Sequence, residues 1–137
     1  MMRNIQFRGL SNSKKWVYGS LIYFGEQPMI EFVKKRHHDD NRVVATDWVY
    51  VDPDSVGQST EMQDRKGQDI YENDIVQTYH LTQGFPTQIG VIKYLDGAFC
   101  FVYGEKPIQI PLIGLPTTLL EVIGNIHDNP ELIKKEE

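Results

Sequence analysis

Acidic side chains concentrated between residues 56 and 76, VGQSTEMQDRKGQDIYENDIV, are the first candidates for chemistry in this chain. They are Glu61, Asp64, Asp69, Glu72 and Asp74. Carboxylates can bind a divalent cation or act as general acids and bases, but a hydrolytic site requires them to converge on one point. The spacing does not match a calcium-binding loop, and no histidine follows the run before His80. A structural role fits better, with Asp64 and Asp74 accepting backbone hydrogen bonds in turns; a metal-dependent hydrolase is the weaker hypothesis.

The segment KKRHHDDNR, Lys34 to Arg42, is the second candidate and contains no apolar residue. Its core, His37-His38-Asp39-Asp40, has the side chains of a metal site. Adjacent side chains on an extended strand point to opposite faces, so neighbours there cannot easily chelate one ion together, whereas on a mobile loop they could bind an ion adventitiously. We therefore expect an exposed loop or hairpin tip, with no metal and no cofactor. The remaining histidines, His80 and His127, are isolated in the sequence, and no catalytic residues are predicted.

The same segment is a candidate interaction surface, because its cations could contact phosphate. They are Lys34, Lys35, Arg36 and Arg42. Outward-facing aromatic side chains could stack on bases, but Trp16 and Trp48 lie among apolar neighbours, which favours core packing. Contact with nucleic acid is therefore an alternative hypothesis for function.

Short strands are the elements that must position these residues. Segments of alternating, β-branched or aromatic character predict strands over residues 3–9, 16–24, 29–33, 43–51, 76–81, 88–95, 98–103 and 119–126. Asp96-Gly97 predicts a type I′ hairpin turn, and Gly84 to Pro86 a loop. Gly124 indicates a bulge in the last strand.

Turn residues and prolines mark where other segments end. Asp64 to Gly67 predicts a turn, and Asn73-Asp74 a tight bend. Prolines at 107, 111 and 116 exclude the segment around them from a central strand. A short helical turn is expected from Asn129.

These patterns predict a mostly β fold: a small β-barrel-like domain with an added N-terminal β-hairpin or sheet and few short helices. We expect an N-terminal β-sheet lobe over residues 1–52 and a C-terminal β-barrel-like lobe over residues 53–137. One compact domain is the alternative.

The composition of the 137 residues indicates a soluble protein of a reducing cytoplasm. With 40% hydrophobic residues the chain can bury a core, yet no apolar stretch reaches the roughly 20 residues of a membrane span. The N-terminus has no apolar segment typical of a secretory signal. One cysteine, Cys100, excludes an internal disulfide and favours a reducing compartment.

Charge is unevenly distributed along the chain, whose net charge is −5. Residues 1–50 hold 8 Lys/Arg and 5 Asp/Glu, whereas residues 51–137 hold 6 and 14. The acidic total argues against non-specific nucleic-acid binding. The uneven distribution is compatible with self-association or a polar intramolecular interface, and also with a solvated surface of no consequence.

Two separated motifs resemble those of the YopX family of phage and prophage proteins. Val56 to Val76 resembles the pattern V-G-Q-x-T-G-x-x-D-x-x-G-x-x-I-Y-E-G-D-I-V, and Glu121 to Leu132 resembles E-V-I-G-N-I-x-x-N-P-E-L. Phe7 to Gly9 and Trp16 to Ser20 are also similar to the family's opening. The resemblance implies a mostly β fold and a phage or prophage origin, and no particular activity.

Glu61 and Asn73 depart from the pattern, because each stands where the family has glycine. Asn tolerates a positive φ, whereas Glu does so poorly, so we expect either an ordinary or a locally adjusted backbone at Glu61. The hypothesis that follows from the whole sequence is a non-enzymatic binding or assembly protein. Its partner would be a second copy of the chain or an unidentified phage or host protein.

Overall fold

The structure, a computed structural model, describes residues 3, 5–79 and 87–133 of the chain. The chain divides into two compact units, Met1–Ser59 (unit 1) and Thr60–Glu137 (unit 2). This division falls inside a strand, β5 (Gly57–Gln63). The lobe boundary predicted between residues 52 and 53 stays a prediction, and His80 and the loop at Gly84 to Pro86 lie outside the described residues.

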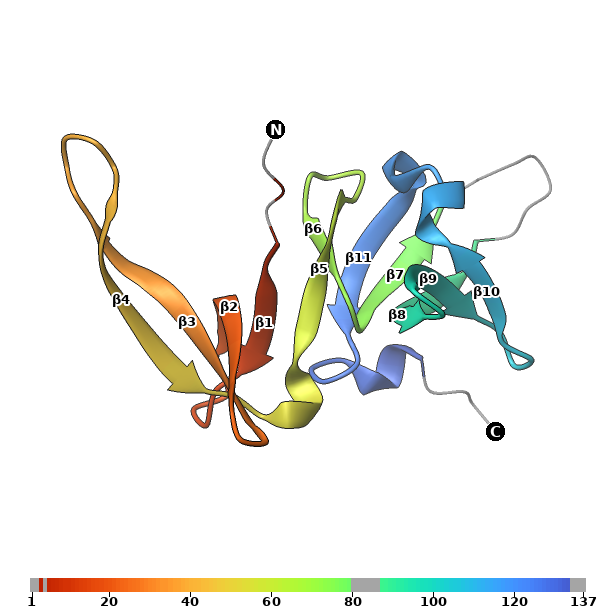
Figure 1. The fold of residues 1–137 in the computed structure, drawn as a ribbon. Helices are drawn as coiled ribbons and strands as arrows, with labels where there is room; N and C mark the ends of the chain where they lie inside the picture. Colours follow the sequence, from red (N-terminus) through yellow and green to blue (C-terminus); the bar gives the residue numbers. More distant parts are fainter. Residues whose placement is uncertain (1–2, 4, 80–86, 134–137) are drawn as a thin grey trace. The chain divides into compact units, whose positions relative to one another are not determined.

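Unit 1 is an antiparallel arrangement of hairpins. Its strands are β1 (Phe7–Leu10), β2 (Trp16–Phe24), β3 (Gln27–Arg36) and β4 (Val43–Tyr50), followed by the 3-10 helix η1 (Pro53–Ser55). They form part of a six-stranded sheet of order β4-β3-β2-β1-β5-β6, to which unit 1 contributes β1 to β4 and the start of β5. Figure 1 shows β3 and β4 as one long hairpin.

The small core of unit 1 forms where β3 and the end of β4 meet β1. Ile30 is fully buried and Val51 nearly so. A Cβ on Gly9 would lie 2.7 Å from the Val51 side chain, so only glycine lets β1 approach this closely. The Ser55 hydroxyl accepts a hydrogen bond from the Leu10 amide at 2.8 Å and donates one to the Asp52 carbonyl at 2.6 Å. These bonds fix the chain where it leaves the hairpins.

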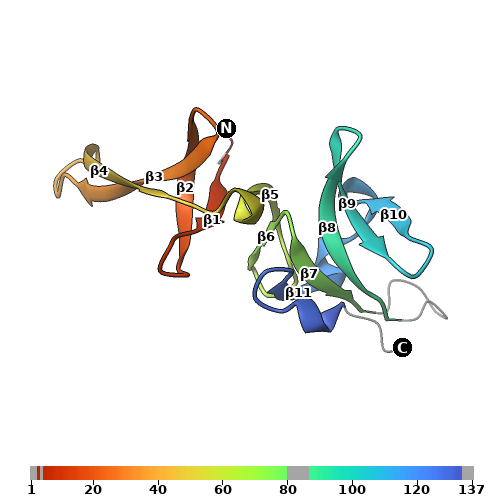
Figure 2. The same ribbon diagram turned by 90° about the horizontal axis from the view of Figure 1, so that it is seen from below.

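Unit 2 holds a five-stranded antiparallel sheet of order β10-β9-β8-β7-β11 (Figure 2). After β6 (Asp69–Tyr71) its strands are β7 (Asp74–Thr78), β8 (Ile89–Leu95), β9 (Ala98–Tyr103), β10 (Ile108–Pro111) and β11 (Leu120–Asn125). The described part of unit 2 also contains three 3-10 helices of three residues each: η2 (Leu112–Gly114), η3 (Thr117–Leu119) and η4 (Pro130–Leu132). The core consists of Ile70, Val76, Ile92, Phe101, Leu112 and Leu120.

The predicted mostly β fold with few short helices is confirmed, but the barrel-like closure is wrong. Within the described residues β10 and β11 are the two ends of an open sheet. The reason lies at β10, which is four residues long and ends at Pro111, whose nitrogen has no hydrogen to donate. An edge strand of this kind does not continue the ladder around a barrel. None of the helices in the described ranges is long and apolar enough to cross a membrane.

Predicted turn chemistry is confirmed at several positions. Asp96 and Gly97 have φ of +51° and +84°, the positive pair that a type I′ turn requires. The register between β11 and β7 shifts at Gly124, which is the predicted bulge. Glu61 adopts φ of +65°, so the ordinary backbone that was one alternative there is not found.

Candidate functional site

The acidic run of the first motif is built around Asp64, which closes a turn and binds β11. Its Oδ1 accepts hydrogen bonds from the amides of Lys66 at 2.8 Å and Gln68 at 2.9 Å. Its Oδ2 accepts one from the Val122 amide at 2.9 Å. Because Val122 belongs to the second motif, one buried carboxylate joins the two motifs that are far apart in sequence.

Electrostatics keep Asp64 ionised. Burial alone raises the pKa of its carboxyl. The backbone hydrogen bonds from Val122, Gln68 and Lys66, helped by the positive charge of Lys66, outweigh burial and lower the pKa below its ordinary value. The Lys66 ammonium lies 3.4 Å from the Glu121 carboxylate, which adds a second link to the second motif. The negative charge of Asp64 therefore stabilises the fold through its hydrogen bonds to backbone amides.

The bend at Asn73-Asp74 has a similar structural role. Asp74 is buried, and its Oδ2 accepts a hydrogen bond from the Tyr71 amide at 2.7 Å. Asn73 adopts φ of +71°, as expected of a residue that replaces glycine, and its side chain accepts a hydrogen bond from the Lys93 ammonium at 3.2 Å. Its carbonyl accepts the Ile126 amide at 3.0 Å.

The second motif forms its own capped turn. A Cβ on Gly124 would lie 2.4 Å from Asn129 Oδ1, so glycine is required for Asn129 to reach the Asn125 amide, 3.2 Å away. Asn125 Oδ1 in turn accepts the amides of His127 and Asp128 at 3.0 and 2.9 Å. The motif residues thus shape the backbone, as the structural interpretation of Asp64 and Asp74 predicted for the first motif.

The carboxylates of the acidic run do not converge. Within the described residues, the group of His, Cys, Asp or Glu side chains close enough to share a metal ion is His37, His38 and Asp39, whose ligand atoms lie within 4.8 Å of one another. The divergence expected of neighbours on an extended strand does not apply here, because β3 ends at Arg36 and residues 38–40 form a turn at the hairpin tip. The two imidazole rings stack with their centroids 5.0 Å apart.

The predicted basic surface, Lys34, Lys35, Arg36 and Arg42, lies around the tip of the β3–β4 hairpin. Acidic residues interrupt it. Lys34 Nζ is 3.8 Å from an Asp47 carboxylate oxygen, and Arg42 Nε is 3.6 Å from Asp40. Arg36 donates to the Asn41 carbonyl at 2.9 Å. The tip therefore presents mixed charge, which is a weak attractor for a phosphate backbone.

An apolar sheet face on unit 1 is the feature that sequence reasoning missed. The strand pairs Ile22–Met29, Met29–Tyr50 and Glu31–Trp48 place their side chains on one face of β2, β3 and β4. Exposed apolar side chains on this outer face are Tyr18 (44% exposed), Ile22 (39%), Val33 (42%), Trp48 (46%) and Tyr50 (44%). We call this set the aromatic face.

Trp48 belongs to this face and not to the core. Its ring contacts that of Tyr50 edge to face, with centroids 5.0 Å apart, and the predicted core position of Trp48 is wrong. Trp16 is half-buried, with the Arg8 guanidinium 4.6 Å from its ring centroid. The sequence contained a signal for this face, because β2 and β4 carry apolar residues on both faces. In an antiparallel sheet one face is normally solvated and polar.

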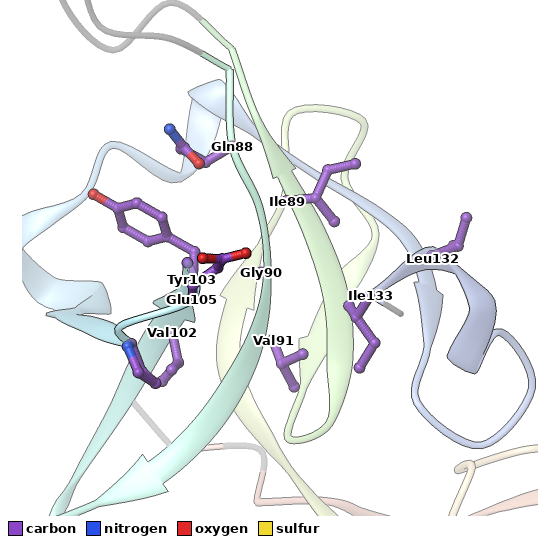
Figure 3. Close-up of a pocket in the computed structure, with 11 residues that line it drawn as sticks. Gln88, Ile89, Gly90, Val91, Val102, Tyr103, Glu105, Leu132 and Ile133 are labelled. Atoms are coloured by element: carbon purple, nitrogen blue, oxygen red, sulfur yellow. The ribbon is translucent and has the colours of Figure 1, made fainter. Parts of the chain in front are cut away.

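Unit 2 has a shallow groove of about 550 Å³ beside β8 and the end of the described chain. Figure 3 shows Ile89 and Val91 of β8 on the same side of the strand as Ile133, and Tyr103 and Glu105 on the other side. Among the described residues that line it, Glu105 is the one carboxylate. A lone carboxylate beside apolar side chains does not provide an acid–base pair.

Comparison with known proteins identifies relatives of this scaffold. The family model described as YopX protein matches residues 6–134. The crystal structure of protein EF1440 from Enterococcus faecalis is similar, with a TM-score of 0.60 and 23% identity over 97% of this chain and 100% of that chain. The structure of protein yopX from Bacillus subtilis has a TM-score of 0.57 and 17% identity over the same shares. At these identities the likeness shows the fold. No curated protein matches the chain.

Proposed function

This chain belongs to the YopX family, and from that premise we propose that it is a non-enzymatic assembly protein of a phage or prophage that associates with a second copy of itself. It would act in the cytoplasm of the bacterial host. The observation that carries the proposal is the aromatic face, where Tyr18, Ile22, Trp48 and Tyr50 expose adjoining apolar surface on one sheet.

Energetics favour covering this face. Trp and Tyr supply most of the binding energy in many protein interfaces, since each buries a large area at little cost in conformational entropy. Exposed apolar patches on monomers are usually small unless they are used for binding. Burial of this face against a partner therefore lowers the free energy of the system.

A second copy is the occupant that fits the character of the face. A two-fold interface brings a surface against itself, so it must be complementary to its own copy. Apolar rings meet this condition. The carboxylate within the face, Glu31, accepts a hydrogen bond from Thr46 at 2.9 Å, so its charge is partly compensated inside the same chain.

The acidic run supports a non-enzymatic role. Asp64 and Asp74, its two buried carboxylates, accept backbone hydrogen bonds and hold turns. Nucleic-acid contact through Lys34 to Arg42 gains little support, since Asp40 and Asp47 lie beside those cations.

Light scattering at increasing protein concentration tests the proposal. We expect a dimer that Trp48→Lys converts to a monomer, because the change places a charge within the apolar contact. Ile113→Lys is the matched control: Ile113 is 91% exposed in unit 2, and its replacement should leave the dimer intact. A wild-type chain that remains monomeric at high micromolar concentration would sink the proposal.

A further inference from the structure

We propose that the tip of the β3–β4 hairpin is a binding site for a transition-metal ion such as Zn²⁺, with His37, His38 and Asp39 as its ligands. Their ligand atoms already lie within 4.8 Å of one another. The site is distinct from the aromatic face and does not depend on the self-association proposed above.

The backbone of the tip is held in a closed loop before any ion binds. The His37 amide donates to the Arg42 carbonyl at 2.8 Å, and the Asn41 amide donates to the His37 carbonyl at 2.9 Å. Asn41 adopts φ of +61°, a conformation that Asn accepts more readily than most residues. Because the loop is ordered by these bonds, binding requires little further loss of backbone entropy.

The nitrogen and oxygen atoms of the tip side chains lie close together. His38 Nε2 is 3.2 Å from Asp39 Oδ1, and His37 Nδ1 is 3.3 Å from Asp40 Oδ1. Ligand atoms bound to zinc at 2.0–2.1 Å in a tetrahedron are separated by about 3.3 Å. The separation between His38 and Asp39 already matches this value, whereas the stacked rings of His37 and His38 must rotate for both to reach one ion.

His37 Nδ1 is already engaged within the tip. The Asp39 amide donates to it at 3.3 Å, and Asp40 Oδ1 lies 3.3 Å from the same nitrogen. A metal ion that binds at Nδ1 would replace the Asp39 amide there, because a neutral imidazole nitrogen has a single lone pair in the ring plane.

The ligand set selects the class of metal. Two imidazoles and a carboxylate favour Zn²⁺, Co²⁺ or Ni²⁺ over Mg²⁺ and Ca²⁺, which prefer oxygen ligands. Asp40 lies close enough to support the ion as a further ligand, although Arg42 Nε is 3.6 Å from its other oxygen. The site is open to solvent, since the His38 side chain is 86% exposed, and water would complete the coordination.

Calorimetric titration of the whole chain with Zn²⁺ tests the proposal, with chemical-shift mapping to locate the ion. We expect one ion per chain, with shifts centred on residues 36–42, and no matching shifts with Mg²⁺. His37→Asn and His38→Asn should each weaken Zn²⁺ binding by about tenfold or more, because each removes one of three protein ligands. Both positions lie on a hairpin tip, so thermal unfolding should be unchanged.

Two controls separate this site from other binding. His80→Asn removes a histidine of another segment and should leave the affinity unchanged. Arg42→Gln removes a positive charge beside Asp40 and should not weaken Zn²⁺ binding, although it would weaken binding to a phosphate. The proposal is overturned if the wild-type chain takes up no Zn²⁺, or if both histidine variants bind it as tightly as the wild type.

Discussion

Glu61 holds a backbone conformation that suits glycine better than glutamate. Its φ of +65° lies in the left-handed region, where a Cβ is close to the following carbonyl oxygen. The family pattern has glycine here, which places no Cβ in that position. The chain therefore carries a local conformational cost in β5 that the rest of the structure must offset.

We expect Glu61→Gly to stabilise the protein by about 1 kcal/mol, because it removes the steric cost of the left-handed conformation. Glu61→Ala is the control, since it removes the same carboxylate but keeps a Cβ and should bring no comparable gain. Urea denaturation of both variants measures the difference. Equal stability of the two variants would show that the charge, and not the backbone, decides the effect.

At the scale of elements, the turn from Asp64 to Gly67 joins strands that the sequence separates widely. Asp64 binds two amides of its own turn and the Val122 amide of β11. The Arg65 amide adds a 2.9 Å hydrogen bond to the Leu120 carbonyl. The turn thus holds β11 in place as well as connecting β5 to β6.

We expect Asp64→Asn to cost about 2 kcal/mol at pH 7, because an amide cannot accept all three hydrogen bonds with a full negative charge. The pKa of Asp64 is lower in the folded chain than when unfolded, so its contribution is complete above about pH 4 and is lost as the pH falls through the folded value. The stability difference between wild type and variant should therefore shrink in acid.

Denaturation curves at pH 7, pH 4 and pH 2.5 measure this dependence. Asp54→Asn is the matched control, since the Asp54 side chain is exposed, and its effect should stay within about 0.5 kcal/mol. A cost for Asp64→Asn that is equal at all three pH values would contradict the role of the ionised carboxylate.

At the scale of the whole molecule, the two units differ in their hydrophobic cores and in whether they contain tryptophan. The hydrophobic cluster of Ile70, Val76, Ile92, Phe101, Leu112 and Leu120 lies entirely in unit 2. Both tryptophans of the chain, Trp16 and Trp48, lie in unit 1. Tryptophan fluorescence therefore reports on unit 1, whereas far-UV circular dichroism reports on strands of both units.

We expect Ile92→Ala to destabilise unit 2 by about 2–5 kcal/mol, because Ile92 is fully buried and its truncation leaves a cavity. Thermal unfolding followed by circular dichroism should then shift more than unfolding followed by tryptophan fluorescence. Tyr94→Ala, at an exposed position of the same strand, is the control and should shift neither. Equal shifts of the two signals for Ile92→Ala would mean that the chain unfolds in one cooperative step.

Local chemistry made much of the fold predictable from sequence. Asp96-Gly97 determines a type I′ turn through its own backbone preferences, Gly124 marks a bulge, and Pro111 confines β10 to an edge. The strand predicted over residues 16–24 coincides with β2, because its aromatic and β-branched side chains favour an extended backbone. Whether the sheet closes into a barrel or stays open was not predictable, since closure depends on the pairing of strands that are distant in the chain.

The sequence by itself determined the family, the mostly β fold and the turns, because each depends on motifs or on interactions between near neighbours. Only the tertiary structure decided what the candidate residues do. Asp64 is a scaffold residue because Val122 lies against it, Trp48 is exposed because of the register of β3 and β4, and His37 and His38 lie together because their backbone turns. In each case the deciding contact depends on how the chain folds back on itself, which residue types alone do not specify.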